Sequence, residues 1–114
     1  MDDAIGEVLG LLDEYQIADN TIVVFFSDNG GSGGADNSPL KGKKGMMFEG
    51  GIRVPCLVRY PAKIKPGTVN DELLTSLELV PTFLKEAAIP LPENVVIDGY
   101  DMLPVLMGKT ASPR

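Results

Sequence analysis

The stretch Thr21-Ile-Val-Val-Phe-Phe-Ser-Asp-Asn-Gly-Gly-Ser32 joins an apolar run to a polar segment rich in glycine. Residues 22–26 are all β-branched or aromatic, which is typical of a strand buried on both faces in the parallel sheet of an α/β protein. Such sheets bind ligands beyond the carboxyl ends of their strands. Asp28 and Asn29 stand at that end, and two hard oxygen donors there indicate a calcium or magnesium site. The alternative is a plain turn, because Asp, Asn and Gly all favour turns.

Further elements surround this strand. Apolar residues at positions 5, 8, 9 and 12 predict a helix over about residues 2–16, and Asp2 or Asp3 can cap its start. A helix that leads into a buried strand is half of a βαβ unit. Downstream we expect a strand at 54–60, a short extended piece at 73–75, a helix from about 78 to 88, a turn at 98–101 and a short helix at 102–107. The chain is therefore predicted to be α/β, with a mainly parallel sheet flanked by helices.

The composition excludes several classes of function. The 114 residues carry a net charge of −6, which argues against a general affinity for nucleic acid or anionic membranes. No apolar run approaches the length of about 18 residues that suggests a membrane span, and the acidic start Met1-Asp-Asp-Ala4 is unlike a signal peptide. One cysteine permits no internal disulfide and leaves the compartment open. There is no histidine, so the commonest proton shuttle at neutral pH is absent.

A long loop at 28–53 follows the first strand, and a loop of this length is usually functional or disordered. Its second half, Lys41-Gly-Lys-Lys-Gly-Met-Met-Phe-Glu-Gly-Gly-Ile-Arg53, holds four cations and four glycines. Ammonium groups on flexible backbone suit a sulfate or phosphate group, although a solvated basic loop is an equal alternative. The segment is not a Walker A loop, because the required Gly-Lys-Ser/Thr ending is missing. A cation site beside an anion-binding loop is what hydrolysis of a sulfate or phosphate ester needs.

Four segments, in order, resemble one known family. They are Asn20-Thr-Ile-Val-Val-Phe-Phe-Ser-Asp-Asn-Gly-Gly31, Lys44-Gly-Met-Met-Phe-Glu-Gly-Gly-Ile-Arg-Val-Pro55, Leu79-Val-Pro-Thr-Phe-Leu84 and Asp98-Gly-Tyr-Asp-Met-Leu-Pro104. They closely resemble the sulfatases of the arylsulfatase type, in the alkaline-phosphatase-like superfamily. The resemblance covers essentially the whole chain. It implies an alkaline-phosphatase-like fold and hydrolysis of sulfate monoesters, with a sulfate ester as partner.

The resemblance also implies roles for single residues. Asp28 and Asn29 are expected to be ligands of the active-site calcium. Lys44 is expected to contact the sulfate ester and to act as a catalytic and substrate-binding residue. Lys41 and Lys43 are near alternatives, but only Lys44 has the family's spacing. Glu49 and Arg53 are expected to order the loop and the following strand rather than to touch substrate.

Part of the family's machinery is missing here. Sulfatases use a formylglycine made from the Cys or Ser of a C/S-x-P-x-R motif, and Cys56 is followed by Leu57-Val-Arg59 instead. Cys56 is therefore predicted to be a buried structural residue, and no nucleophile is expected in this chain. The formylglycine is expected in a missing N-terminal part. Residues 1–114 are thus predicted to form a single partial domain, the later part of a sulfatase catalytic domain, that binds calcium weakly and is inactive alone.

Two other interpretations stay open. One is a non-catalytic remnant or interaction module that forms homo-oligomers through exposed sheet edges. The other is a phosphate-ester hydrolase of the same superfamily, although the pattern Glu49-Gly-Gly-Ile-Arg53 after the lysine favours a sulfatase.

Overall fold

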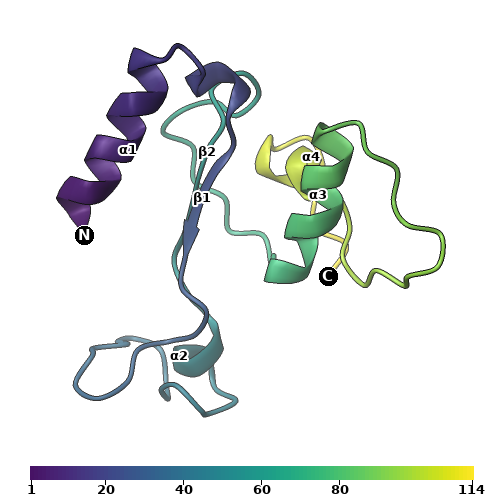
Figure 1. Ribbon diagram of the computed structural model, residues 1–114. Helices are drawn as coiled ribbons and strands as arrows, with labels where there is room; N and C mark the ends of the chain where they lie inside the picture. Colours follow the sequence, from purple (N-terminus) through teal and green to yellow (C-terminus); the bar gives the residue numbers. More distant parts are fainter. The chain divides into compact units, whose positions relative to one another are not determined.

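The computed structural model describes residues 1–114 and divides into two compact units, Met1–Ala62 and Lys63–Arg114. The first unit contains helix α1 (Asp2–Glu14), a 3₁₀ turn (Ala18–Asn20), strand β1 (Val23–Phe26), helix α2 (Glu49–Ile52) and strand β2 (Cys56–Arg59) (Figure 1). The second contains a 3₁₀ turn (Ser76–Glu78), helix α3 (Leu79–Glu86) and helix α4 (Leu103–Leu106). No helix combines the length and the apolar character that crossing a membrane would require.

Helix α1 confirms the helix predicted from the apolar spacing, but its cap differs from the prediction. Met1 occupies the N-cap position, and no side chain caps the helix. Asp2 and Asp3 lie in the first turn instead, where their charges are favourable because the helix dipole is positive at its N-terminus. The other end of α1 is tied to the sheet, since Arg59 of β2 forms a 2.8 Å ion pair with Asp13.

The sheet of this chain corrects two expectations. Strands β1 and β2 form a two-stranded antiparallel pair, with Val23 opposite Arg59 and Phe26 opposite Cys56, whereas a mainly parallel sheet was expected. The long loop reverses the chain between the strands, which makes the antiparallel direction possible. Strand β1 is not buried on both faces either, because Phe25 and Phe26 are 42% and 39% exposed. A two-stranded ribbon lacks the covering layers that such an apolar run requires.

The second unit packs around its two helices. Met102, Leu103 and Val105 are buried, and Thr82 links the helices because its hydroxyl donates to the Glu78 carbonyl (2.7 Å) and accepts from the Met102 N–H (2.8 Å). These helices confirm the two predicted downstream. The extended piece predicted at 73–75 forms no strand, and residues 98–101 form no turn. Instead the backbone at Gly99 runs so close to the Leu77 carbonyl that a side chain there would overlap it.

Glu78 is the most deeply buried side chain of the second unit. Its carboxylate accepts hydrogen bonds from the N–H (2.5 Å) and hydroxyl (2.8 Å) of Thr75 in a capping box, and it pairs with Arg114. Arg114 also donates to the Asp98 carbonyl (3.2 Å). Burial acts to raise the pKa of Glu78, but the hydrogen bonds from Arg114 and Thr75 outweigh it and the pKa is lowered. This carboxylate therefore joins the start of the 3₁₀ turn to Arg114, and Arg114 extends the link to Asp98.

Candidate functional site

The loop at 28–53 lies beyond the carboxyl end of β1, and its last residues form α2 (Figure 1). Asp28 is exposed and Asn29 is half-buried directly after this strand. The Ser27 hydroxyl donates to the Asn29 carbonyl (2.8 Å), which fixes the backbone here. The Asp28 carboxylate forms no hydrogen bond or ion pair within the chain, so its oxygens are available to a ligand.

Backbone hydrogen bonds bring the two halves of this loop together. The Gly30 N–H donates to the Gly51 carbonyl (2.9 Å), and the Lys44 N–H donates to the Gly31 carbonyl (3.1 Å). The second bond joins Lys44, the predicted sulfate-binding residue, to Gly31, which follows closely after Asn29. The structure thus brings the backbone segments of all three predicted site residues into one loop junction.

Close packing of glycines makes this junction possible. A Cβ atom at Gly30 would overlap the Gly50 carbonyl oxygen, and one at Gly51 would overlap the Met46 carbonyl oxygen. Only glycine lets these backbones approach so closely. The residues that sequence reasoning described as a Glu49-Gly-Gly51 turn form the single helical turn α2, and both of its glycines are buried.

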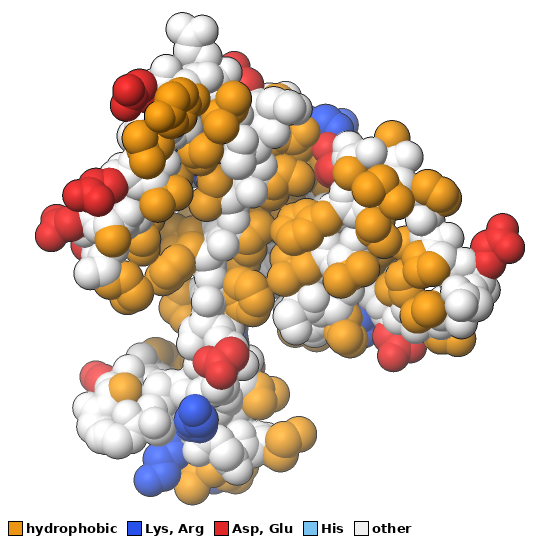
Figure 2. Space-filling model, viewed as in Figure 1, with side chains coloured by type: hydrophobic (Ala, Val, Ile, Leu, Met, Phe, Trp, Pro, Cys, Tyr) orange, Lys and Arg blue, Asp and Glu red, His pale blue; other side chains and the backbone are white.

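The basic side chains of the loop occupy different settings. Figure 2 shows blue side chains gathered over the loop that carries α2. The Lys41 ammonium lies 4.4 Å from the centroid of the Phe48 ring, and Lys43 lines a shallow hollow together with Asn37 and Met46. Lys44 is exposed and its ammonium forms no ion pair within the chain. Of the three lysines, Lys44 is the one whose backbone bonds to the 28–31 segment.

Asn37 organises this loop and was not singled out from the sequence. Its side-chain oxygen accepts from the Gly31 N–H (2.9 Å), and its amide nitrogen donates to the carbonyls of Gly31 (3.0 Å) and Gly42 (3.2 Å). An Asn among Ser, Gly and Asp residues resembles any loop residue in sequence. The only sequence signal was the abundance of glycine, which permits such close backbone packing but does not indicate the partner.

Comparison with known proteins identifies the family. The family model described as "Sulfatase" matches residues 1–89. This chain belongs to the sulfatase family. It is 40% identical to human steryl-sulfatase over 120 residues, covering 96% of this chain and 21% of the relative, and 40% identical to human arylsulfatase A over 119 residues, covering 100% and 23%. The chain therefore spans about a fifth of the length of these relatives.

Solved sulfatase structures show the same fold. The crystal structure of Ps i-CgsB in complex with k-i-k-neocarrahexaose matches with a TM-score of 0.90 and 38% identity, covering 96% of this chain and 25% of that chain. The structure of BT4656 in complex with D-glucosamine-2-N,6-O-disulfate matches with a TM-score of 0.77 and 30% identity, covering 98% and 22%. The sulfatase chain thus has the alkaline-phosphatase-like fold of its structural neighbours over nearly all of its residues.

Glu49 and Arg53 form an exposed pair across α2. Their side chains approach to 3.5 Å, and the Arg53 N–H donates to the Glu49 carbonyl (2.7 Å). Because both side chains are more than half exposed, the ion pair itself contributes little, about 0–1 kcal/mol. The contact joins the end of the loop to the segment that leads into β2, as expected of ordering residues.

Cys56 corrects a prediction. It was expected to be buried, but it is exposed at the start of β2, because the two-stranded ribbon has no layer to cover it. Desolvation by neighbouring atoms raises the pKa of its thiol. A raised thiol pKa lowers the fraction of reactive thiolate at neutral pH.

The donor atoms of the loop fit a hard cation in kind but not in number. Carboxylate and amide oxygens suit calcium or magnesium, and calcium takes about six to eight oxygens. Asp28 and Asn29 supply a fraction of these, and no group of three or more acidic, Cys or His side chains lies close enough together to hold a metal ion. The side chains of Asp28 and Asn29 therefore supply only part of a calcium coordination shell.

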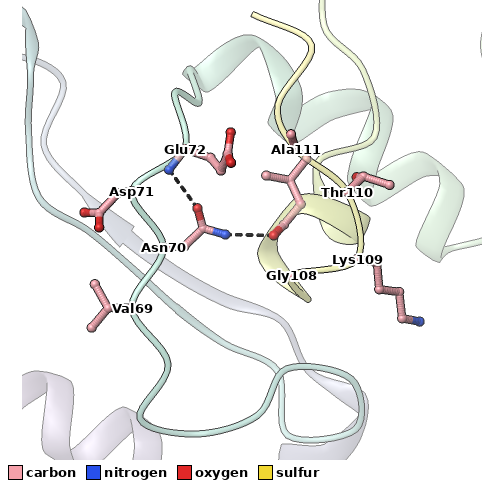
Figure 3. A pocket seen from close by; sticks show the side chains of 9 residues that line it. Val69, Asn70, Asp71, Glu72, Gly108, Lys109, Thr110 and Ala111 are labelled. Atoms are coloured by element: carbon pink, nitrogen blue, oxygen red, sulfur yellow. Dashed lines mark hydrogen bonds between the residues drawn. The ribbon is translucent and has the colours of Figure 1, made fainter.

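A second pocket lies within the Lys63–Arg114 unit, between the 69–72 and 108–111 segments (Figure 3). Two of its polar side chains, Asn70 and Glu72, form hydrogen bonds within the unit. The Asn70 amide donates to the Val105 carbonyl (2.7 Å) and its oxygen accepts from the Glu72 N–H (2.9 Å), while Glu72 accepts from the Ser112 N–H (2.9 Å). These bonds join the 69–72 segment to α4 and to the segment that follows it.

Proposed function

We propose that residues 1–114 form a single partial domain, the later part of a sulfatase catalytic domain that hydrolyses sulfate monoesters. The chain would contribute two cation ligands and a sulfate-binding lysine to a site completed by the rest of a longer protein. The main support is the Lys44 N–H···O=C Gly31 hydrogen bond, because it joins the lysine to the segment that carries Asp28 and Asn29. A plain turn at 28–31 would need no such partner.

Each proposed role follows from the chemistry of the side chain. The oxygens of Asp28 and Asn29 hold calcium, and calcium when bound polarises the oxygens of the sulfate ester. Lys44 binds the sulfate through charge-assisted hydrogen bonds and stabilises negative charge that develops in the transition state. The nucleophile, a formylglycine, belongs to a C/S-x-P-x-R motif outside these residues. The isolated chain is therefore expected to be inactive and to bind calcium weakly.

The exposed apolar surface of the ribbon supports a larger sheet in the whole protein. Phe25 and Phe26 on β1 and Leu57 on β2 are all exposed, although this apolar composition is typical of a covered sheet. We propose that further strands, mainly parallel, and helices of the longer protein cover these residues. Without them the same surface favours self-association, which is the basis of the alternative that the present chain is a non-catalytic, oligomerising module.

The relatives favour a sulfate ester over a phosphate ester as substrate. Those reported above include a steryl-sulfatase and an arylsulfatase, and one solved relative holds a disulfated glucosamine. A phosphate-ester hydrolase remains the alternative that shares the superfamily architecture. The negative net charge gives no support to a nucleic-acid or membrane partner.

A chimera tests this function. The chain would replace the matched segment of human arylsulfatase A, over which the two are 40% identical, and hydrolysis of aryl sulfate and aryl phosphate would be measured with calcium. We expect sulfatase activity, and a loss of about 10²–10³ in kcat for Lys44→Ala, with little effect of Lys43→Ala as the matched control. An active chimera in which Lys44→Ala and Asp28→Ala both keep full activity would refute the assignment.

A further inference from the structure

We infer that Asn37 is a positioning residue that holds the backbone of Lys44, and with it the sulfate-binding ammonium, in the geometry of the candidate site. This inference rests on the function proposed above for Lys44. Asn37 itself needs no contact with substrate, because it acts through the backbone.

The argument begins with the hydrogen-bonding capacity of the Asn37 side chain. An Asn amide has two N–H donors and one carbonyl acceptor. Here the Asn37 amide nitrogen donates to the Gly31 carbonyl, and the Asn37 side-chain oxygen accepts from the Gly31 N–H. The side chain therefore pairs with the Gly31 backbone as a residue on a neighbouring strand would. The second donor bonds to the Gly42 carbonyl. Every donor of the side chain is therefore used to hold loop backbone.

The Gly31 carbonyl connects Asn37 directly to Lys44. This oxygen accepts both the Asn37 amide at 3.0 Å and the Lys44 N–H at 3.1 Å. A carbonyl has two lone pairs, so it can accept both bonds at once. Loss of the Asn37 amide would free the Gly31 peptide to rotate, and the Lys44 bond depends on the direction of that carbonyl.

The Gly42 contact holds the basic segment at a second point. Gly42 has a positive φ of 91°, a conformation that favours glycine, and a Cβ at this position would overlap the Phe48 side chain. Asn37 therefore bonds directly to the basic segment at Gly42, and it reaches Lys44 through the shared Gly31 carbonyl. Without it, the remaining backbone bonds from Gly30 to Gly51 and from Gly50 to Lys41 still close the loop, but none of them engages Gly31 or Lys44.

This difference gives a readout that a general loss of stability would not produce. In amide hydrogen exchange on the 114-residue chain, Asn37→Ala should remove protection at Gly31 and Lys44 while Gly30 and Gly50 keep theirs. Asn37→Asp keeps the acceptor and removes both donors, so it should retain protection at Gly31 and lose it at Lys44. Ser32 lies in the same loop and its side chain forms no hydrogen bond, so Ser32→Ala is the control. It should leave the protection of all four amides unchanged.

The functional consequence is measured by titrating inorganic sulfate and following the Lys44 resonances. We expect the apparent dissociation constant to rise about five- to tenfold in Asn37→Ala, the change expected for the loss of one hydrogen bond, and to stay unchanged in Ser32→Ala. Gly31→Ala places a Cβ against the side chains of both Ala35 and Asn37 and so disturbs the Asn37 contact. Its effect and that of Asn37→Ala should therefore be less than additive in the double variant.

The outcomes separate this inference from the proposed function. Unchanged Lys44 protection and sulfate affinity in Asn37→Ala would overturn the inference. If the wild-type chain binds no sulfate but Asn37→Ala still deprotects Gly31 and Lys44 selectively, the positioning role stands and the function of Lys44 fails. Resonances of α1 and of the β1–β2 pair report whether the first unit stays folded. If Asn37→Ala disorders the whole first unit, the test is the difference in amide protection between Gly31 and Lys44 in Asn37→Asp. An equal loss of protection at both residues would overturn the inference.

Discussion

At the scale of single residues, the chain contains two polar side chains that join separate stretches of the chain. Asn37 joins Gly31 to Gly42, and Glu78 joins Thr75 to Arg114. The partners of Asn37 and the pairing of Glu78 with Arg114 were not predictable from the sequence, because contacts brought together by folding leave no periodic pattern. The Thr75-Ser-Leu-Glu78 spacing of the capping box is a recognisable sequence signature. Asp28 and Asn29 were proposed from their position after an apolar strand, and Lys44 was proposed from the resemblance to the sulfatases. These three assignments stay predictions.

The buried Glu78 carboxylate should make stability depend on pH. Its pKa is lowered in the folded chain, so its contribution is fully present above the unfolded value, about 4.3, and is lost as the pH falls through the lower folded value. We expect the free energy of unfolding of the second unit to decrease below about pH 4.3. Urea unfolding between pH 7 and pH 2.5 measures it, and Glu78→Gln should flatten this decrease. An equally steep decrease in Glu78→Gln would contradict the account.

Removing the partner of Glu78 should destabilise the same unit. Arg114→Ala leaves a buried carboxylate without its cation, which typically costs about 3–5 kcal/mol when a buried pair is broken. The partly exposed guanidinium (29%) places the expected cost toward the lower end of that range. Lys109→Ala, a cation without an ion pair in the same unit, is the control. Equal midpoints for both variants in urea would show that Arg114 does not hold Glu78.

At the scale of elements, helices were easier to predict than the sheet. The faces of α1 and α3 follow from local apolar spacing, and their ends fall within a few residues of the prediction. The strands were located correctly from their β-branched and aromatic residues, but their antiparallel pairing depends on a loop of some thirty residues that reverses the chain. Burial of β1 failed as a prediction because it depends on layers that 114 residues do not supply.

Glycine substitutions should have opposite effects in α1 and in the loop. Gly6 and Gly10 face open space within α1, so Gly10→Ala should stabilise that helix by about 1 kcal/mol. Gly30→Ala places a Cβ on the Gly50 carbonyl and should destabilise the loop by about 1–3 kcal/mol. Amide exchange at Gly51 and in α1 measures both. A stable, protected loop in Gly30→Ala would disprove the close packing described at this junction.

At the scale of the whole molecule, the chain is a sulfatase segment whose sheet has exposed edges and an apolar surface. This predicts concentration-dependent self-association of the isolated chain. Leu57→Lys places a charge on β2, where Leu57 is 63% exposed, and should weaken the association measured by sedimentation velocity. Val96→Lys is the matched control, because Val96 is 91% exposed outside the sheet. Equal effects of the two variants would mean that association does not involve the ribbon.

The measurement that tests the central claim most directly is a calcium titration of the isolated chain, followed by NMR at the side chains of Asp28 and Asn29. Two oxygen ligands predict weak binding, in the millimolar range or weaker, with shifts confined to residues 28–31 and abolished by the isosteric Asp28→Asn. Unchanged resonances at 28–31 up to high calcium, or shifts that survive Asp28→Asn, would contradict the claim that this loop carries a sulfatase cation site.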